Sequence, residues 1–98
     1  MNIRAAVEFR EWAASLSEIL RGLVNDRLDR IRHNGHFGDA KGLGEGLFEL
    51  RWKNGLRVYF SYVVDMNGRA ILMLLGGDKD GQNRDIRKAR NILAREAA

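Results

Sequence analysis

LFELRWKNGLRVYFSYVV, residues 47–64, decides the fold because apolar and polar side chains alternate through both of its halves. In Leu47–Lys53 one side carries Phe48, Leu50 and Trp52. In Arg57–Val64 one side carries Val58, Phe60, Tyr62 and Val64. A period of two is typical of a half-buried strand. The stretch therefore predicts two antiparallel strands joined by a tight turn.

The turn between these strands determines which faces meet. A two-residue Asn54-Gly55 turn would place Arg51 beside Val58 and would mix polar and apolar side chains on both faces. A three-residue loop over 53–55, with Gly55 in the left-handed region, keeps one face apolar through the pairs Trp52–Leu56, Leu50–Val58 and Phe48–Phe60. We therefore predict the three-residue loop, which places Arg51 opposite Arg57 and Glu49 opposite Tyr59 on the other face.

The chain beyond this hairpin predicts one more strand and a final helix. Asp65–Gly68 is typical of a turn, and Ala70–Leu75 is an apolar run that suits a central strand covered on both faces. We expect Gly76-Gly77 to end that strand and Asp80 to cap the helix after it. The final helix is otherwise basic and carries an apolar stripe of Ile86, Ala89, Leu93 and Ala97.

The chain before the hairpin predicts two helices. Val7–Ala14 has the pattern of a short amphipathic helix, and Ser15 to Glu18 has the pattern of a capping box. A second helix then runs to about His33, with apolar residues at spacings of three and four: Leu16, Ile19, Leu20, Leu23, Val24, Leu28 and Ile31. Asn34–Gly46 has five glycines and no period, which predicts an irregular loop.

These segments together predict an α+β fold. A small antiparallel sheet, a three-stranded meander, packs against two N-terminal helices and one C-terminal helix. Asn2–Ala5 is a candidate for an additional strand. With 98 residues, the chain is long enough for a single domain over 1–98.

The composition narrows the function classes. The chain has no cysteine, which excludes disulfides, thiolate nucleophiles and cysteine zinc sites and makes the cytoplasm the expected compartment. Its longest apolar run, Ala70–Leu75, is far shorter than the roughly 20 residues of a membrane helix. We expect no cofactor, no metal and no membrane partner.

The charge distribution points to a polyanionic or acidic partner. The chain has 17 basic and 13 acidic residues, and its net charge is +4. Residues 47–98 supply all of this surplus, with 10 basic and 6 acidic side chains. Thirteen of the basic residues are arginines, which suit the bidentate binding of phosphate or carboxylate.

The pairing register singles out Arg51 and Arg57 as a candidate site. Like charges directly opposite each other on a sheet are destabilising, so a partner must compensate them. One interpretation is that Glu49 and solvent do so. The other is a phosphate clamp, with Tyr59 offering a ring for a base or a hydroxyl for proton transfer, and with Lys79 joining from the end of the sheet.

Further basic residues flank this candidate site. Lys53 in the hairpin loop and Arg84, Arg87 and Lys88 on the final helix are candidate RNA-binding residues, although a solvated helix face is the ordinary interpretation of such a run. The glycine-rich segment Gly42–Gly46 is followed by no Gly-Lys-Ser/Thr sequence and leads into a strand, so a nucleotide-binding loop is not expected.

Three sequence blocks resemble a known family. They are FGDAKGLGEGLFELR at residues 37–51, RVYF at residues 57–60, and GGDK at residues 76–79 followed by Gln82, Arg84, Asp85 and Ile86. In this order they are similar to the RelE/ParE superfamily of toxins, and most similar to its HigB-like, phage-related "addiction module killer" branch. The resemblance extends over nearly the whole chain.

The resemblance implies a toxin of a type II toxin–antitoxin system. It implies a compact α+β domain that a neighbouring antitoxin holds inactive, commonly a helix-turn-helix protein, with operator DNA contacted only through that antitoxin. By position, Arg51, Arg57 and Lys79, and then Tyr59, are most like the functional residues of the family. Many relatives cut messenger RNA in the ribosomal A site, whereas the ParE branch poisons DNA gyrase.

Three functions are compatible with these observations. The leading hypothesis is a ribosome-dependent messenger RNA interferase, a metal-independent endoribonuclease in which Arg51 and Arg57 hold the scissile phosphate. Lys79 or Tyr59 would then handle protons as the 2′-hydroxyl of the RNA attacks. The alternatives are a ParE-like toxin that poisons gyrase by protein binding alone, and a chain that only binds its antitoxin.

Overall fold

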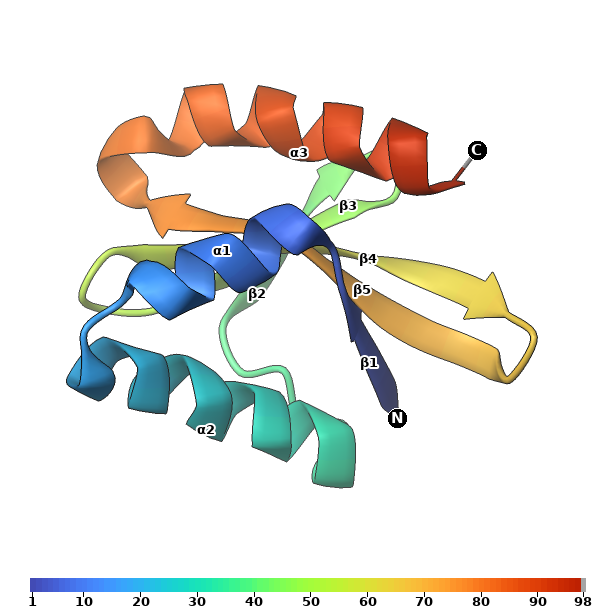
Figure 1. The fold of residues 1–98 in the computed structure, drawn as a ribbon, viewed down its shortest axis with the longest axis horizontal. Coiled ribbons are helices and arrows are strands. Elements are labelled where there is room, and N and C mark those ends of the chain that lie inside the picture. Colours follow the sequence, from blue (N-terminus) through green and yellow to red (C-terminus); the bar gives the residue numbers. More distant parts are fainter. Residues whose placement is uncertain (98) are drawn as a thin grey trace.

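The computed structural model describes residues 1–97, which form one five-stranded sheet with helices on both faces (Figure 1). The strands are β1 (Asn2–Ala5), β2 (Ala40–Gly44), β3 (Leu47–Arg51), β4 (Leu56–Asp65) and β5 (Gly68–Asp78). The helices are α1 (Val7–Ser15), α2 (Glu18–Asn34) and α3 (Gln82–Ala97), and a 3-10 turn, η1 (Lys79–Gly81), precedes α3. The predicted α+β class is confirmed.

The strand order in the sheet is β1-β5-β4-β3-β2. β3, β4 and β5 form the predicted antiparallel meander, and β5 lies inside the sheet between β1 and β4. The candidate strand at Asn2–Ala5 is present as β1, and it pairs parallel to β5. The sheet is therefore mixed rather than purely antiparallel, because the two N-terminal helices carry the chain from one edge to the other.

The predicted register of the β3–β4 hairpin is confirmed. Glu49 pairs with Tyr59, and Arg51 pairs with Arg57. The Trp52 N–H donates to the Leu56 carbonyl over 3.0 Å, which closes the three-residue loop. Gly55 has a φ of 99°, in the left-handed region that this loop requires.

The prediction of an irregular loop over Asn34–Gly46 is wrong in its second half. Residues 40–44 form β2, whose Lys41 pairs with Glu49 at the edge of the sheet. Two of the five residues of β2 are glycines, which contribute no side chain to an alternating pattern and so concealed the strand.

Gly76-Gly77 does not end β5, contrary to prediction. The strand continues to Asp78, which pairs with Leu56 at the start of β4. Both glycines are sites of close packing instead. The Trp12 ring of α1 lies against Gly76, and the carboxylate of Asp85 in α3 lies against Gly77, so that neither position has space for a Cβ.

The helix caps also differ from the prediction. Ser17, not Ser15, is the N-cap of α2, and its hydroxyl accepts from the Leu20 N–H over 3.3 Å. The Ser15 hydroxyl donates to the Trp12 carbonyl and so belongs to the end of α1. At the end of β5 the capping carboxylate is that of Asp78, which accepts from the N–H groups of Asp80 and Gly81.

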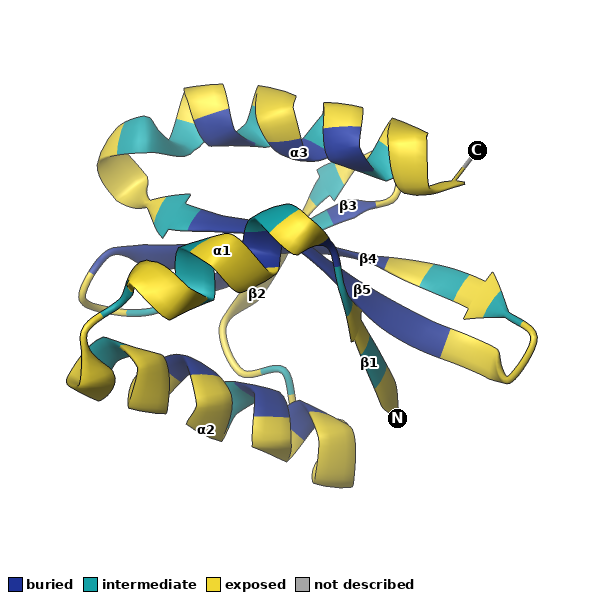
Figure 2. Ribbon diagram, viewed as in Figure 1, coloured by how far each residue is buried: buried dark blue, intermediate teal, exposed yellow. Residues whose placement is uncertain are grey.

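The core has two layers, one on each face of the sheet (Figure 2). α1 and α2 cover the layer that contains Leu50, Val58 and Phe60, whereas α3 covers the layer that contains Leu47, Tyr59 and Leu74. In Figure 1, α3 and α2 lie on opposite sides of the sheet. The predicted Arg51, Arg57 and Tyr59 face is therefore the face that α3 packs against.

The predicted apolar stripes are correct only in part. α2 buries Val24, Leu28 and Ile31 but leaves Ile19 and Leu23 exposed. In α3 the buried apolar residues are Ala89 and Ile92, and Ile92 was absent from the predicted stripe. No helix within residues 1–97 has the length and apolar character needed to cross a membrane.

Candidate functional site

Arg57 is a buried member of an ion pair. Its side chain is 10% exposed, and its Nε lies 3.6 Å from Oε1 of Glu49, whose side chain has no exposed surface. Arg57 Nη1 donates to the carbonyls of Trp52 and Leu56 over 3.2 and 2.9 Å. The guanidinium therefore binds the base of the hairpin and its neighbouring strand, and not solvent.

The first turn of α3 covers this ion pair. Gln82 Nε2 donates to Glu49 Oε1 over 2.5 Å. Asp85, one turn further along α3, is buried and lies against Gly77, the residue that pairs with Arg57 on β5. In this structure Arg57 is therefore not open to a phosphate, as the clamp interpretation requires, because α3 packs over this part of the sheet.

Tyr59 is fully buried in the layer beneath α3. Its hydroxyl has no hydrogen-bond partner within residues 1–97. Burial, and then the negative charges of Glu49 and Asp85, raise the pKa of Tyr59 well above its ordinary value. The hydroxyl therefore keeps its proton at neutral pH, and in this conformation no base can stack on the ring.

Arg51 lies beside Arg57 but is partly accessible. Its backbone N–H donates to the Asp39 carbonyl, and its own carbonyl accepts from Arg27 Nη2 over 3.0 Å. The Arg27 guanidinium also stacks on Trp52, 4.3 Å from the ring centroid. Arg27 of α2 thus fixes the end of β3 at which Arg51 is placed.

Exposed cations gather at the hairpin end of the sheet. Lys79, Arg84 and Arg87 line one hollow of about 370 Å³ together with the polar residues Asp80, Gln82 and Asn83. The Lys79 N–H donates to the Gly55 carbonyl, which joins this hollow to the hairpin loop that carries Lys53. We call Lys53, Lys79, Arg84 and Arg87 the hairpin-end cations.

Lys88 does not belong to the hairpin-end cations. It lines a different hollow with Glu8, Glu11 and Trp12 of α1, and its charge contributes to lowering the pKa of Glu8. Arg84 borders both hollows. Of the predicted RNA-binding residues, the structure therefore brings three to one end of the sheet and places Lys88 among acidic side chains.

Glu49 and Gln82 both belong to this site, and the sequence predicts the place of Glu49 but not that of Gln82. Glu49 does compensate Arg57, as one interpretation of the arginine pair predicts, but it does so as a fully buried carboxylate. The pairing register did contain the signal, because Glu49 lies directly opposite Tyr59 and diagonally from Arg57 on the same face. Gln82 had no such signal, since its contact depends on where α3 crosses the sheet.

A sequence relative covers almost the whole chain. It is an uncharacterised protein of Haemophilus influenzae, 35% identical over 97 residues, and the match covers 98% of this chain and 95% of the relative. This chain belongs to the same family as that protein. No protein-family model matches the sequence.

Solved structures that are similar to this chain include toxins and toxin–antitoxin complexes. A double Arg-to-Ala mutant of Escherichia coli RelE in the free state matches with a TM-score of 0.70 and 12% identity, over 94% of this chain and 97% of RelE. The chain has the fold of the RelE toxins. The intact E. coli RelBE toxin–antitoxin complex matches with a TM-score of 0.63 and 11% identity, over 79% of this chain and 94% of the matched chain.

A third match extends the same fold to another toxin. The YoeB/ParE toxin of Agrobacterium tumefaciens has a TM-score of 0.61 and 12% identity, over 80% of this chain and 98% of that protein. The RelE fold that the sequence resemblance implied is thus confirmed, whereas the HigB-like branch is not resolved by these matches. In this RelE fold the hairpin-end cations lie at the end of the meander that also carries Arg51.

Proposed function

We propose that this chain is the toxin of a type II toxin–antitoxin pair and that it inhibits translation as a ribosome-dependent messenger RNA interferase. The observation that carries the proposal is the group of exposed hairpin-end cations in a RelE fold. The structural relatives include the E. coli toxin RelE and its complex with an antitoxin, RelBE. A cationic hollow at the end of the sheet that also carries the half-buried Arg51 suits the phosphates of an RNA backbone.

The exposed residues are the ones that contact RNA in this proposal. Lys79, Arg84 and Arg51 bind the phosphates on either side of the cleaved bond and stabilise the charge that develops on the phosphoryl oxygens. Lys53 and Arg87 extend the same cationic surface along the RNA. Lys88 contributes little, because it lies among Glu8 and Glu11.

The RNA supplies its own nucleophile in the proposed reaction. The 2′-oxygen attacks the adjacent phosphorus, the bond from phosphorus to the 5′-oxygen breaks, and the products are a 2′,3′-cyclic phosphate and a 5′-hydroxyl. The 2′-hydroxyl loses its proton to water, and the Lys79 ammonium gives a proton to the departing 5′-oxygen. Lys79 has this role because it is exposed, whereas the Tyr59 hydroxyl is enclosed.

Arg57 and Tyr59 act indirectly in this proposal. Arg57 is a positioning residue, since its guanidinium binds the carbonyls at the base of the hairpin that carries Arg51 and Lys53. Tyr59 fills the layer under α3 and supports the cations at the start of that helix. The antitoxin, commonly a helix-turn-helix protein in the resembled branch, is the proposed inhibitor and the proposed link to operator DNA, and the cytoplasm is the proposed compartment.

Induced expression in a bacterial host tests the proposal. We expect growth arrest within minutes of induction, together with new 5′ ends in messenger RNA that disappear when translation initiation is blocked. The double variant Lys79→Ala, Arg84→Ala is expected to lose cleavage by at least about 100-fold. Arg30→Ala, which removes an exposed arginine from α2, is the matched control. Intact message in arrested wild-type cells would contradict the interferase.

Poisoning of DNA gyrase by protein binding is the second candidate function. The observation that favours it is the covering of Arg57 and Tyr59 by α3, which removes two residues of the expected RNA-cleaving set from the surface. It predicts growth arrest with intact messenger RNA and with double-strand breaks in DNA. It also predicts that Lys79→Ala, Arg84→Ala arrests growth as strongly as the wild type.

A further inference from the structure

We propose that Arg27 of α2 is a positioning residue for RNA cleavage, because it holds the main chain of Arg51 at the end of β3. The inference rests on the proposed function for the cleavage itself, and it deepens that function by giving a role to a residue outside the hairpin-end cations. α2 covers the face of the sheet opposite to α3. Arg27 therefore acts through Arg51 and not through contact with RNA.

The orientation of the Arg51 side chain depends on how firmly its main chain is held. The Arg51 Nε is buried and has no hydrogen-bond partner within residues 1–97. Arg57 lies directly opposite on β4, and like charges at opposed positions of a sheet repel each other. The bonds of the Arg51 N–H and carbonyl are therefore the ones that fix where its guanidinium can reach.

Both of these main-chain groups are bound from outside the β3–β4 hairpin. The Arg51 N–H donates to the Asp39 carbonyl over 2.9 Å. β2 begins only at Ala40, which pairs with Leu50, so β2 has no residue opposite Arg51. The Arg51 carbonyl accepts instead from Arg27 Nη2 over 3.0 Å. Arg27 thus supplies the donor that one more residue of β2 would supply.

The Arg27 guanidinium is itself fixed by its surroundings. Its Nη1 donates to the Phe37 carbonyl over 3.3 Å, and its plane stacks on Trp52, 4.3 Å from the ring centroid. It also packs closely against Gly38, where a Cβ would lie 3.4 Å from Arg27 Cζ. A lysine cannot reproduce these contacts, because its ammonium is neither planar nor forked.

The solvation of Arg27 separates it from the hairpin-end cations. Burial, and then the charge of Arg30, lower the pKa of Arg27. Both of its terminal nitrogens donate to protein carbonyls. A guanidinium engaged in this way has few donors left for a phosphate, whereas its rigid fork suits the joining of two main-chain segments. Its contacts thus favour positioning over RNA binding.

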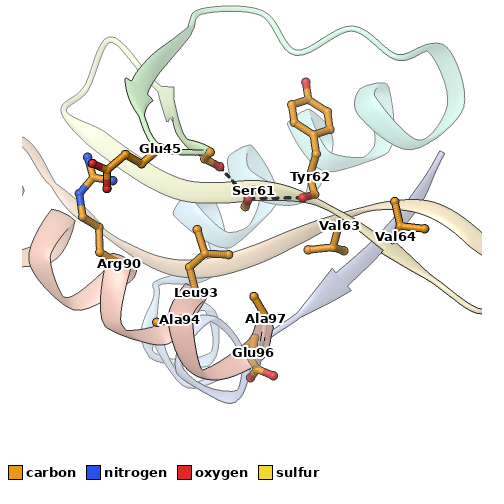
Figure 3. A pocket seen from close by; sticks show the side chains of 11 residues that line it. Glu45, Ser61, Tyr62, Val63, Val64, Arg90, Leu93, Ala94, Glu96 and Ala97 are labelled. Carbon is orange, nitrogen blue, oxygen red and sulfur yellow. Dashed lines mark hydrogen bonds between the residues drawn. The ribbon is translucent and has the colours of Figure 1, made fainter.

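Arg90 of α3 makes the same kind of contact at a different place. Its Nη1 and Nη2 donate to the carbonyls of Gly44 and Leu43 over 3.2 and 2.9 Å. Arg90 lines a groove of about 780 Å³ between β4 and the C-terminal half of α3 (Figure 3). Gly44 lies just before β3, and Arg51 is the last residue of β3. Arg90→Lys therefore removes an equivalent fork without touching the Arg51 main chain.

Cleavage of messenger RNA on ribosomes by the purified chain tests the inference. We expect Arg27→Lys to lower kcat at least about tenfold and to leave KM unchanged, because the charge is kept while the Arg51 main chain is released. Arg90→Lys, the matched control, is expected to leave both constants within about twofold of the wild type. Trp52→Phe weakens the stack on Arg27 and is expected to lower kcat by a smaller factor.

Two further measurements separate positioning from a general loss of stability. Arg27→Lys on an Arg51→Ala background is expected to cause no further loss of kcat, since nothing is then left to position. In the free protein, Arg27→Lys is expected to speed amide hydrogen exchange at Arg51 and to leave exchange at Tyr59 unchanged. General destabilisation would speed both.

Each contrary result has a distinct meaning. Wild-type kcat in Arg27→Lys, equal losses in Arg27→Lys and Arg90→Lys, or unchanged exchange at Arg51 overturns this inference and leaves the proposed function intact. A further loss on the Arg51→Ala background as large as that on the wild type overturns it as well. A wild-type chain that leaves messenger RNA intact on ribosomes overturns the proposed interferase, and this inference with it.

Discussion

Arg57 and Glu49 form an ion pair in a part of the sheet that solvent scarcely reaches, with Nε and Oε1 3.6 Å apart. At this distance the contact is electrostatic and not a hydrogen bond. Glu49 Oε1 is instead hydrogen-bonded by Gln82, while its Oε2 has no partner within residues 1–97. The pair therefore joins β3, β4 and α3, and the loss of one member leaves an uncompensated charge under the helix.

Removing one member of this pair is expected to be costly. We predict that Glu49→Ala lowers the free energy of unfolding by about 3–5 kcal/mol, because it leaves Arg57 charged, buried and unpaired. The double variant Glu49→Leu, Arg57→Met is expected to lose much less, since no charge of the pair then remains under α3. Urea unfolding of the wild type and both variants measures these losses. Equal losses in the single and the double variant would contradict a role for the charge.

Replacing glycine by alanine is expected to have opposite effects on stability at Gly76, which Trp12 approaches closely, and at Gly22. A Cβ at position 76 would overlap atoms of the Trp12 ring, so Gly76→Ala is expected to destabilise by about 1–3 kcal/mol or more. Gly22 lies in the interior of α2 with no atom near its Cβ position. Gly22→Ala is therefore expected to stabilise by about 1 kcal/mol. Thermal unfolding compares the two, and a Gly76→Ala protein as stable as the wild type would refute the packing argument.

Local sequence patterns predict most of the helices and strands because these elements depend on residues that are close together in the sequence. The hairpin register is set by the apolar face and by Gly55, and it placed Arg51 opposite Arg57 correctly. The strand at Ala40–Gly44 escaped prediction because Gly42 and Gly44 give no alternating pattern. The sequence also did not predict that β5 continues through Gly76-Gly77. These glycines make room for Trp12 of α1 and Asp85 of α3, and the contact with Trp12 is distant in sequence.

The sequence predicts which face of the sheet carries the candidate site residues, but it does not predict which of them are exposed. Alternation showed that Arg57 and Tyr59 share a face, and this is correct. It could not show that α3 would cover that face, since the apolar stripe of α3 does not say which side of the sheet it packs against. The burial of Glu49 was hidden for the same reason. Lys79 was placed correctly at the sheet end because it directly follows β5.

The Glu8–Arg95 ion pair predicts a pH dependence of stability. Hydrogen bonds from Arg95 lower the pKa of Glu8 from 4.5 to about 2. The folded pKa lies below the unfolded one, so this contribution is fully present above pH 4.5 and is lost as the pH falls through about 2. We expect Glu8→Gln to melt at a lower temperature than the wild type near neutral pH.

The difference between these two proteins is expected to shrink as acid is added. It should decrease between pH 4.5 and 2, and it should also decrease with added salt, because Arg95 is half exposed. Melting curves over this pH range measure the effect. A difference that persists unchanged below pH 2 would show that the carboxylate does not act through its charge.

The unpartnered hydroxyl of Tyr59 predicts that its removal is tolerated. Tyr59 Oη is buried without a hydrogen bond within residues 1–97, so Tyr59→Phe is expected to leave the free energy of unfolding unchanged or to raise it by up to about 1 kcal/mol. Ser61→Ala is the matched control on the same strand. The buried Ser61 hydroxyl donates to the Gly46 carbonyl over 2.6 Å, so its removal is expected to cost about 1 kcal/mol. Chemical unfolding of both variants measures these values.

Tyr59→Phe also tests whether Tyr59 supports toxicity only through packing or whether its hydroxyl takes part in RNA cleavage. Burial and the nearby charges of Glu49 and Asp85 raise the pKa of Tyr59, which keeps the hydroxyl protonated and unable to act as a base. We therefore expect Tyr59→Phe to arrest growth and to cut message as the wild type does, while Lys79→Ala reduces both. Loss of cleavage in a stably folded Tyr59→Phe protein would show that α3 moves aside and that the hydroxyl reaches the RNA.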